Sequence, residues 1–379
     1  VCEQPIKTIN GGSTWRYSSS GYSGGRVGDS GCVSPIGWDP GNSQRFVMFL
    51  SDWGPFLTED GGSTFRGLDV PHYQGSKSSP AGALDPTPNS QVVVTASGTR
   101  YIQSLFITRD MGVNWTRIQN TDDLYRFIAF HPQNTNVIYA GKYKSTNKGY
   151  NWITLTKTVV GMYKNNGNIV YALGSSGGST IVYKSTDGGI TWTTPYPAIP
   201  ANGNINIGQV AIAPDNENRI YLTIKGYGIY VITGTVENGG IVKLKNYSNT
   251  IPSPNPNNVT GLKRDQFNEQ NTYHVAVDPK NPNILYAGSF STHKGVSDGV
   301  FRSTDYGETW NNVSYNLSTW FTPWGMAVSP VDSYAYVFSD RGTWKLPPPS
   351  TTAIADTTAP NCSIGINGGA SSTNTTAVI

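Results

Sequence analysis

The segment STDGGITW, residues 185–192, has close copies elsewhere in this chain of 379 residues. Three of them are TRDMGVNW (108–115), STNKGYNW (145–152) and STDYGETW (303–310). Three looser copies are TINGGSTW (8–15), TEDGGSTF (58–65) and TVENGGIV (235–242). A turn that returns seven times predicts a fold built from one repeated unit.

A second pattern runs in step with the turn. Seven segments, from GWDPGNSQRFVMFL (37–50) to AVSPVDSYAYVFS (327–339), read as two strands joined by a turn rich in Pro, Asn or Asp. Each unit therefore contains two strands, a loop, a third strand, the repeated turn and a fourth strand. Four antiparallel strands with a period of about 40 to 50 residues are typical of a propeller blade. We expect an all-β, seven-bladed β-propeller.

The residues of the turn have structural reasons to be there. Asp at its third position can accept hydrogen bonds from amides of a tight bend. Gly at the fifth position can take a left-handed conformation, and the following Trp can pack between blades. We therefore assign a structural role to the aspartates at this position, which are Asp60, Asp110, Asp187 and Asp305.

The ends of the chain predict how the ring closes. The seventh unit stops after its third strand, whereas the N-terminal segment supplies a turn and a strand without the two strands that should precede them. Pairing the two ends would complete the last blade and leave no open sheet edge. We expect a propeller over residues 1–347, a Pro/Thr/Ser-rich linker over 348–360 and the start of an immunoglobulin-like module over 361–379. Cys2 and Cys32 either form a disulfide or remain isolated buried thiols.

Composition restricts the partners. The net charge is +3 without a basic run, and no apolar stretch approaches the length of a membrane helix, so neither nucleic acid nor membrane insertion is indicated. No His, Cys or acidic cluster has metal-ligand spacing, and we expect no metal or cofactor. The chain opens on VCEQPIKT, as in a processed form, and its Asn-rich, Lys-poor composition suits a secreted or cell-surface protein. We expect it to be monomeric within a larger modular protein.

The repeated turn resembles the Asp-box, or bacterial neuraminidase repeat, which occurs in propellers of diverse function. The segment FLSDWGPFLTEDGGSTFRGLDV (49–70) and the strand-turn-strand segment that follows it resemble the xyloglucanases of glycoside hydrolase family 74. In that family, the Asp of a D-[VI]-G-G motif is one of two catalytic carboxylates, and this resemblance assigns the role to Asp52. Trp53 and Pro55 depart from the family motif. The family also binds substrate between two propellers, whereas this chain predicts one.

The connections between second and third strands, and those between units, should meet on one face of the propeller, opposite the repeated turns. This face collects aromatic side chains, which stack on sugar faces, and polar groups that bind hydroxyls. The candidate substrate-binding residues are Trp53, Tyr73, Arg100, Tyr101, Arg264, Trp320 and Trp324. For any single aromatic side chain, filling a gap between blades is an equal alternative.

A polysaccharide-degrading hydrolase requires two carboxyl groups. Asp52 is the first candidate, and Asp340, in the matching loop of the seventh unit, is the better-placed partner. Asp265, Asp298 and Glu269 follow as alternatives, and Asp340 has the competing interpretation of a turn aspartate paired with Arg341.

Two other functions remain open. A lyase acting on a uronate-containing polymer requires a cation and a His or Tyr that transfers protons, for which His72, Tyr73, His293 and Arg126 are candidates, with Arg100 and Arg264 as further cations. The third interpretation is a non-catalytic propeller that binds carbohydrate or protein. Of the remaining histidines, His131 has a structural interpretation, and His274 is placed near the channel mouth.

Overall fold

We describe a computed structural model of the chain, covering residues 6–7, 16–17, 36–51, 53–99, 101–176, 179–196, 198, 207–224, 228–232, 245–246, 272–290, 299–313, 323–339 and 342–349. Within these residues all regular structure is β, in agreement with the predicted fold class. None of these segments contains a helix of the length and hydropathy needed to cross a membrane.

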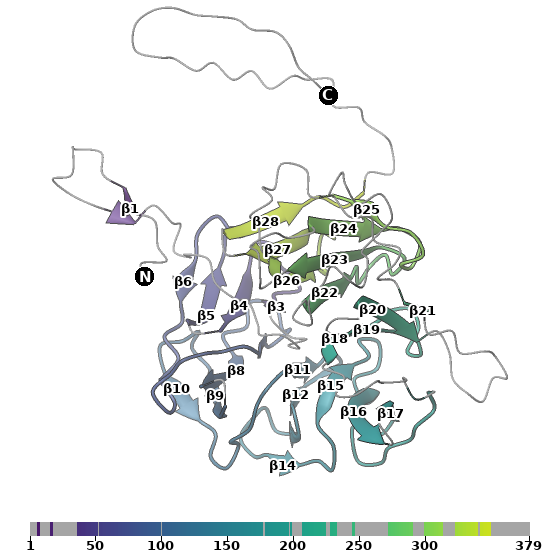
Figure 1. The fold of residues 1–379 in the computed structure, drawn as a ribbon. Helices are drawn as coiled ribbons and strands as arrows, with labels where there is room; N and C mark the ends of the chain where they lie inside the picture. The colour runs from purple at the N-terminus through teal and green to yellow at the C-terminus, as the bar shows by residue number, and fades with distance from the viewer. Residues whose placement is uncertain are drawn as a thin grey trace, which may run out of the picture.

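Besides a two-stranded sheet near the N-terminus, seven antiparallel sheets follow one another along the described chain and are arranged in a ring (Figure 1). The first three each have four strands. They are β3 (Ile36–Trp38), β4 (Phe46–Leu50), β5 (Gly54–Thr58) and β6 (Arg66–Gly67); β7 (Gly82–Leu84), β8 (Val93–Gly98), β9 (Gln103–Thr108) and β10 (Trp115–Arg117); and β11 (Ile128–His131), β12 (Asn134–Ala140), β13 (Tyr143–Ser145) and β14 (Ile153–Thr154).

The last four sheets repeat this order. They are β15 (Val159–Met162), β16 (Val170–Ser176) and β17 (Ser179–Ser185); β18 (Ile207–Ile212), β19 (Ile220–Ile224), β20 (Gly228–Ile232) and β21 (Lys245–Asn246); β22 (Thr272–Val277), β23 (Leu285–Phe290), β24 (Gly299–Ser303) and β25 (Asn311–Asn312); and β26 (Pro323–Val328), β27 (Ala335–Ser339) and β28 (Gly342–Leu346).

The fourth sheet differs from the predicted four strands. Its fourth strand is reduced to an isolated bridge between Lys184 and Thr193. Pro195 and Pro197 follow this bridge, and proline has no amide hydrogen to donate to a strand ladder.

Each hydrophobic cluster of the described residues joins two successive sheets. Tyr221 and Val231 of the fifth sheet, for example, share a cluster with Phe301 and Trp310 of the sixth. The seventh sheet contacts the first in the same way, because Tyr336 of β27 packs against Phe46 and Trp38, with ring centroids 5.1 and 5.0 Å apart. The core of this molecule therefore lies between its sheets, as in neighbouring blades of a propeller.

The repeated turns are closed by their own side chains. In the turn that begins at Ser303, Ser303 Oγ donates to Asp305 Oδ1 at 2.7 Å, and Asp305 accepts from Thr309 N and Thr309 Oγ1 at 2.9 and 2.5 Å. The same pattern holds Asp60, Asp110 and Asp187. Gly307 has a φ of 90°, in the left-handed region. Trp310 donates Nε1–H to Gly307 O and lies buried between the fifth and sixth sheets.

Substituting Asp305 by Ala is expected to destabilise the fold by about 1 to 2 kcal/mol at pH 7, because the buried Ser303 hydroxyl and the Thr309 amide lose their acceptor. Burial raises the pKa of Asp305. The hydrogen bonds from Thr309 and Ser303 together lower this pKa by more than burial raises it, so the net pKa is below the usual value. The stabilisation is therefore present above the unfolded pKa of about 4 and is lost as the pH falls. Urea unfolding at pH 7 and at pH 3 measures both effects.

Asp305→Asn is the control, because Asn147 occupies the same place in the repeated turn of the third sheet and accepts the same backbone hydrogen bond. An Asn variant as unstable as the Ala variant would contradict the hydrogen-bond explanation.

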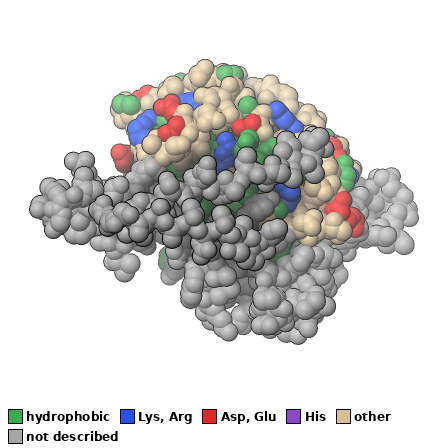
Figure 2. Space-filling view, turned by 90° about the horizontal axis from the view of Figure 1, so that it is seen from above, with side chains coloured by type: hydrophobic (Ala, Val, Ile, Leu, Met, Phe, Trp, Pro, Cys, Tyr) green, Lys and Arg blue, Asp and Glu red, His purple; other side chains and the backbone are tan. Residues whose placement is uncertain are grey.

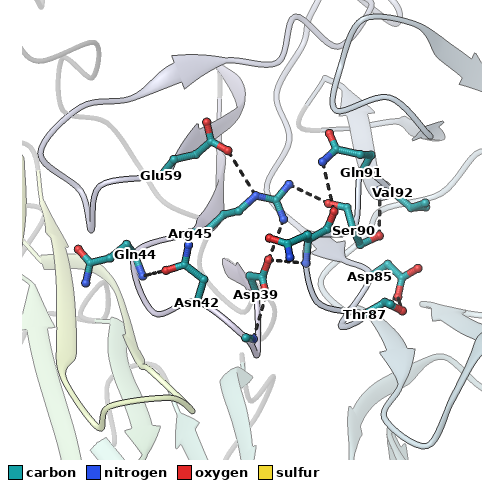
Figure 3. A network of polar contacts seen from close by, with 12 residues as sticks. Asp39, Asn42, Gln44, Arg45, Glu59, Asp85, Thr87, Ser90, Gln91 and Val92 are labelled. Atoms are coloured by element: carbon teal, nitrogen blue, oxygen red, sulfur yellow. Dashed lines mark hydrogen bonds and ion pairs between the residues drawn. The ribbon is translucent and has the colours of Figure 1, made fainter.

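A buried ion pair joins the first two sheets at the turns between their first and second strands (Figure 3). Asp39 Oδ2 accepts from Arg45 Nη1 and from Asn89 N, both at 2.9 Å, and Asp39 Oδ1 accepts from Gly41 N. Arg45 also donates to Ser90 O at 2.8 Å. One carboxylate therefore fixes its own turn and the turn of the next sheet.

The N-terminal segment is described only at β1 (Ile6–Lys7) and β2 (Arg16–Tyr17), which pair with each other. Closure of the last blade by this segment stays a prediction, as do the domain boundaries. Cys2, Cys32 and the expected linker and module beyond residue 349 lie outside the described residues.

Figure 2 shows acidic and basic side chains interspersed on the visible part of the surface.

Candidate functional site

The order of strands defines two faces of the ring. The repeated turns and the turns between first and second strands share one end of each sheet, which we call the turn face. The connections between second and third strands, and those between successive sheets, share the other end, which we call the loop face. In propellers, the loop face surrounds one mouth of the central channel.

Several predicted site residues lie on connections outside the described residues. These are Asp52, Arg100, His293, Arg264, Trp320 and Asp340, together with the alternative carboxylates Asp265, Glu269 and Asp298 and with Arg341. Trp324 lies on β26, and its side chain is not described. The roles assigned to these residues stay predictions.

The strands on either side of Asp52 and Asp340 are described, and they show at which end of its sheet each chain segment leaves and returns. Leu50 of β4 pairs with Gly54 of β5, so residues 51–53 connect the two strands at the loop face. Ser339 of β27 pairs with Gly342 of β28, so residues 340–341 do the same in the seventh sheet. Because the first and seventh sheets contact each other, these two connections leave neighbouring sheets at the same end.

Gly54, the first residue of β5, lies close to the connection between β6 and β7. Its φ of 88° lies in the left-handed region, and a Cβ there would stand 3.2 Å from Val70 Cγ1. Trp53 is partly buried and packs against the cluster between the first and seventh sheets. The segment next to Asp52 is therefore supported by the core on one side and by the connection between β6 and β7 on the other.

The described candidates are placed on the loop face with different exposures. His72 and Arg126 are exposed, and Tyr73 is partly exposed. Tyr101 is 71% exposed. Tyr125, next to Arg126, is instead buried in the cluster between the second and third sheets, where it contributes to the core.

A polar cluster on this face joins two connections that are far apart in the sequence. Tyr73 OH donates to Asp122 Oδ2 at 2.5 Å, and Arg117 Nη2 donates to Asp122 Oδ1 at 3.0 Å and to Tyr73 OH at 3.1 Å. Arg117 Nε donates to Ser104 Oγ at 3.0 Å, and the guanidinium carbon lies 4.4 Å from the centroid of the Tyr73 ring. We call Tyr73, Arg117 and Asp122 the loop-face triad.

The triad holds Asp122 as an anion. Burial raises the pKa of Asp122, but the hydrogen bonds from Tyr73 and Arg117 and the guanidinium charge outweigh it, so the net pKa lies below the usual value. A carboxylate that is ionised at neutral pH accepts hydrogen bonds from hydroxyl groups and cannot act as a general acid. Arg117 is in turn neutralised by Asp122, so it does not offer an uncompensated positive charge.

Arg117 and Asp122 were not among the residues selected from the sequence. A weak signal was present, because Tyr73 follows the first residue of its repeated turn, Thr58, by 15 residues, and Asp122 follows Thr108 by 14. The two residues therefore occupy equivalent connections of successive sheets.

Two of the four histidines have buried side chains. His131 is buried at the end of β11, where its Nδ1 accepts from Gln133 N at 3.2 Å, and burial lowers its pKa. His274 is buried within β22, and burial lowers its pKa to about 4. Both side chains are therefore neutral at pH 7. The described residues contain no group of three or more His, Cys, Asp or Glu side chains arranged to hold a metal ion.

Comparison with curated proteins finds distant relatives. No protein-family model matches the chain. It is 24% identical over 298 residues to the xyloglucanase Xgh74A of Acetivibrio thermocellus, an alignment that covers 74% of this chain and 32% of the relative. It is 25% identical over 261 residues to a xyloglucanase of Hypocrea jecorina, covering 62% and 28%. The chain thus spans about a third of the length of the curated relatives it matches.

Comparison with solved structures supports the propeller fold. The glycoside hydrolase family 74 xyloglucanase of Xanthomonas campestris matches with a TM-score of 0.60 at 16% identity, over 84% of this chain and 52% of that one. YCF48 from Cyanidioschyzon merolae matches with a TM-score of 0.56 at 16% identity, over 85% and 98%. At these identities the likeness establishes the fold alone.

Proposed function

We propose that this chain is a xyloglucanase-like glycoside hydrolase that acts outside the cell on a β-linked polysaccharide. The observation that carries the proposal is the similarity to two curated xyloglucanases over most of the chain. The sequence resemblance around Asp52 supports it, and the propeller fold shared with a family 74 enzyme is consistent with it. Because the chain spans only part of its relatives, the activity of the whole relatives is carried to it as a proposal.

Asp52 and Asp340 are proposed as the two carboxylates. Glycosidases place their carboxyl groups about 5 Å apart when they retain the anomeric configuration and roughly 6.5 to 9.5 Å apart when they invert it. The described strands support the pairing, because the connections that carry these residues leave neighbouring sheets at the loop face.

The lyase alternative has weaker support from the described residues. Elimination requires a cation that neutralises the uronate carboxylate and a group that removes the α-proton. His72 and Arg126 are exposed on the loop face, but the Tyr73 hydroxyl and the Arg117 guanidinium are already engaged by Asp122. A non-catalytic, polysaccharide-binding propeller remains the other outcome of the test.

An activity screen distinguishes the three functions. The full chain is incubated with xyloglucan, mixed-linkage glucan, pectin and alginate, and the products are analysed by mass spectrometry and by absorbance of unsaturated uronates. New reducing ends from xyloglucan without unsaturated products support the proposal. Unsaturated products would establish the lyase, and retention of polymer without any cleavage would establish a binding protein.

A further inference from the structure

The second sheet carries three connections that meet at its loop-face end. Gly98 at the end of β8 bridges to Ser78, and Ser97 Oγ donates to Pro71 O at 2.8 Å, which fixes the connection before the sheet. Gln103 at the start of β9 bridges to Asp123, which fixes the connection after it. The short turn between β8 and β9, with Tyr101 in it, therefore lies between the two connections that the loop-face triad joins.

The turn that carries Tyr101 is itself closed. Thr99 N donates to Ile102 O at 2.9 Å, and Thr99 Oγ1 accepts from Tyr101 N and Ile102 N, both at 3.2 Å. The ring of Tyr101 nevertheless stays 71% exposed. A large aromatic surface held on a fixed backbone loses little conformational freedom when it stacks on a ligand.

The triad supplies polar groups at the same end of the second sheet as this ring. The side chains of Arg117 and Asp122 are 34% and 38% exposed, and the hydrogen bond between Arg117 Nη2 and Asp122 Oδ1 holds them in a fixed position. Asp122 and Arg117 compensate each other's charge. An exposed aromatic ring and a carboxylate–guanidinium pair without net charge at the same end of a sheet suit an uncharged sugar, whose apolar face stacks and whose hydroxyls donate and accept hydrogen bonds.

We infer that Tyr101 and the loop-face triad form a sugar-binding subsite on the second sheet, which takes a neutral sugar unit of a polysaccharide by stacking on Tyr101 and hydrogen bonding to Asp122 and Arg117. The inference rests on the proposed substrate class but does not require catalysis. It adds residues that lie outside the connection carrying Asp52.

Tyr150 provides a matched control within the same chain. It is 72% exposed and has an arginine beside its ring, with the Arg109 guanidinium carbon 4.2 Å from the ring centroid, but it lies in the repeated turn of the third sheet, on the turn face. Its own turn carries no carboxylate–guanidinium pair of the triad's kind among the described residues. If the polysaccharide bound to any exposed tyrosine, replacing either residue by alanine would weaken binding equally.

The test uses affinity electrophoresis of the full chain in gels containing soluble xyloglucan, together with initial rates over a range of xyloglucan concentrations. Tyr101→Ala is expected to weaken binding about tenfold, and Tyr150→Ala to leave it unchanged. Asp122→Asn should weaken binding several-fold, with circular dichroism showing an intact fold.

The outcomes separate this inference from the proposed function. Hydrolysis with an unchanged KM in Tyr101→Ala would overturn the subsite and leave the hydrolase in place. Binding that depends on Tyr101 without any hydrolysis would support the subsite and reject the hydrolase. Equal losses in Tyr101→Ala and Tyr150→Ala, or no retention of the unsubstituted chain by xyloglucan, would overturn the subsite.

Discussion

Replacing Asp52 by Asn is expected to lower kcat for xyloglucan by on the order of 10³-fold while leaving substrate binding within about twofold of the parent. Asn has nearly the same shape as Asp but can neither donate a proton to a leaving glycosidic oxygen nor carry the negative charge of a nucleophile or base. Positioned acid–base groups contribute about 10² to 10⁴ in rate, and the loss of one of two essential carboxyl groups falls in this range. Initial rates of reducing-end release measure kcat, and affinity electrophoresis measures binding.

Asp69→Asn is the matched control for this experiment. Asp69 lies in the connection between β6 and β7 on the same face, is exposed, and has a φ of 46°, a conformation that Asn tolerates as well as Asp does. We expect this variant to keep the parental rate and melting temperature. If Asp52→Asn kept full activity, or lost it only together with its fold, Asp52 would not be the catalytic carboxylate and the resemblance around it would be a structural one.

The periodic parts of the fold were predictable from the sequence because a regular sheet imposes a regular residue pattern. The seven strand pairs anticipated between residues 37 and 339 are the first two strands of the seven sheets, from β3–β4 to β26–β27. The left-handed glycines of the turns were predictable for the same reason, as at Gly307. The prediction of a fourth strand in the fourth sheet was wrong, because prolines interrupt the repeat pattern there.

The arrangement of the loop face was less predictable. Tyr73 and Asp122 are 49 residues apart, and their hydrogen bond depends on how two irregular connections cross the end of one sheet. No periodicity governs such loops, so composition identified aromatic and charged candidates without showing which of them touch. For the same reason, the sequence did not show that Tyr125 packs in the core while its neighbour Arg126 is exposed.

The two faces of the molecule differ in how they use carboxylates. On the turn face, Asp305 and Asp39 satisfy donors of their own or adjacent turns, and their hydrogen bonds stabilise the sheets. On the loop face, Asp122 binds a tyrosine and an arginine that remain partly open to solvent. Asp39 and Asp305 therefore accept from backbone amides and side chains of their own or the next turn, whereas Asp122 joins side chains that come from two different connections.

The substitution Arg45→Met is expected to lower the free energy of unfolding by about 3 to 5 kcal/mol, because it leaves the buried charge of Asp39 without its cation. Arg45 and Asp39 side chains are 5% and 1% exposed, so water cannot replace the lost partner. The variant also loses the bond from Arg45 to Ser90 O, which links the first two sheets. Guanidinium chloride unfolding at pH 7 measures the change. Arg109→Met, at an exposed arginine in the repeated turn of the second sheet, should cost at most about 1 kcal/mol.

The pH dependence of this variant tests the cause of its instability. In the parent chain, burial raises the pKa of Asp39, but the hydrogen bonds from Gly41, Arg45 and Asn89 outweigh it and hold the net pKa below the usual value. That stabilisation is present above the unfolded pKa of about 4 and is lost as the pH falls. In Arg45→Met the pKa of Asp39 should rise, since burial then lacks its main opposing charge. The difference in stability between the two chains should therefore shrink below about pH 4, and the added substitution Asp39→Asn should recover part of the loss at pH 7. A difference that stays constant from pH 7 to pH 3, with no recovery in the double variant, would mean that lost packing of the arginine side chain, rather than an uncompensated carboxylate, destabilises the fold.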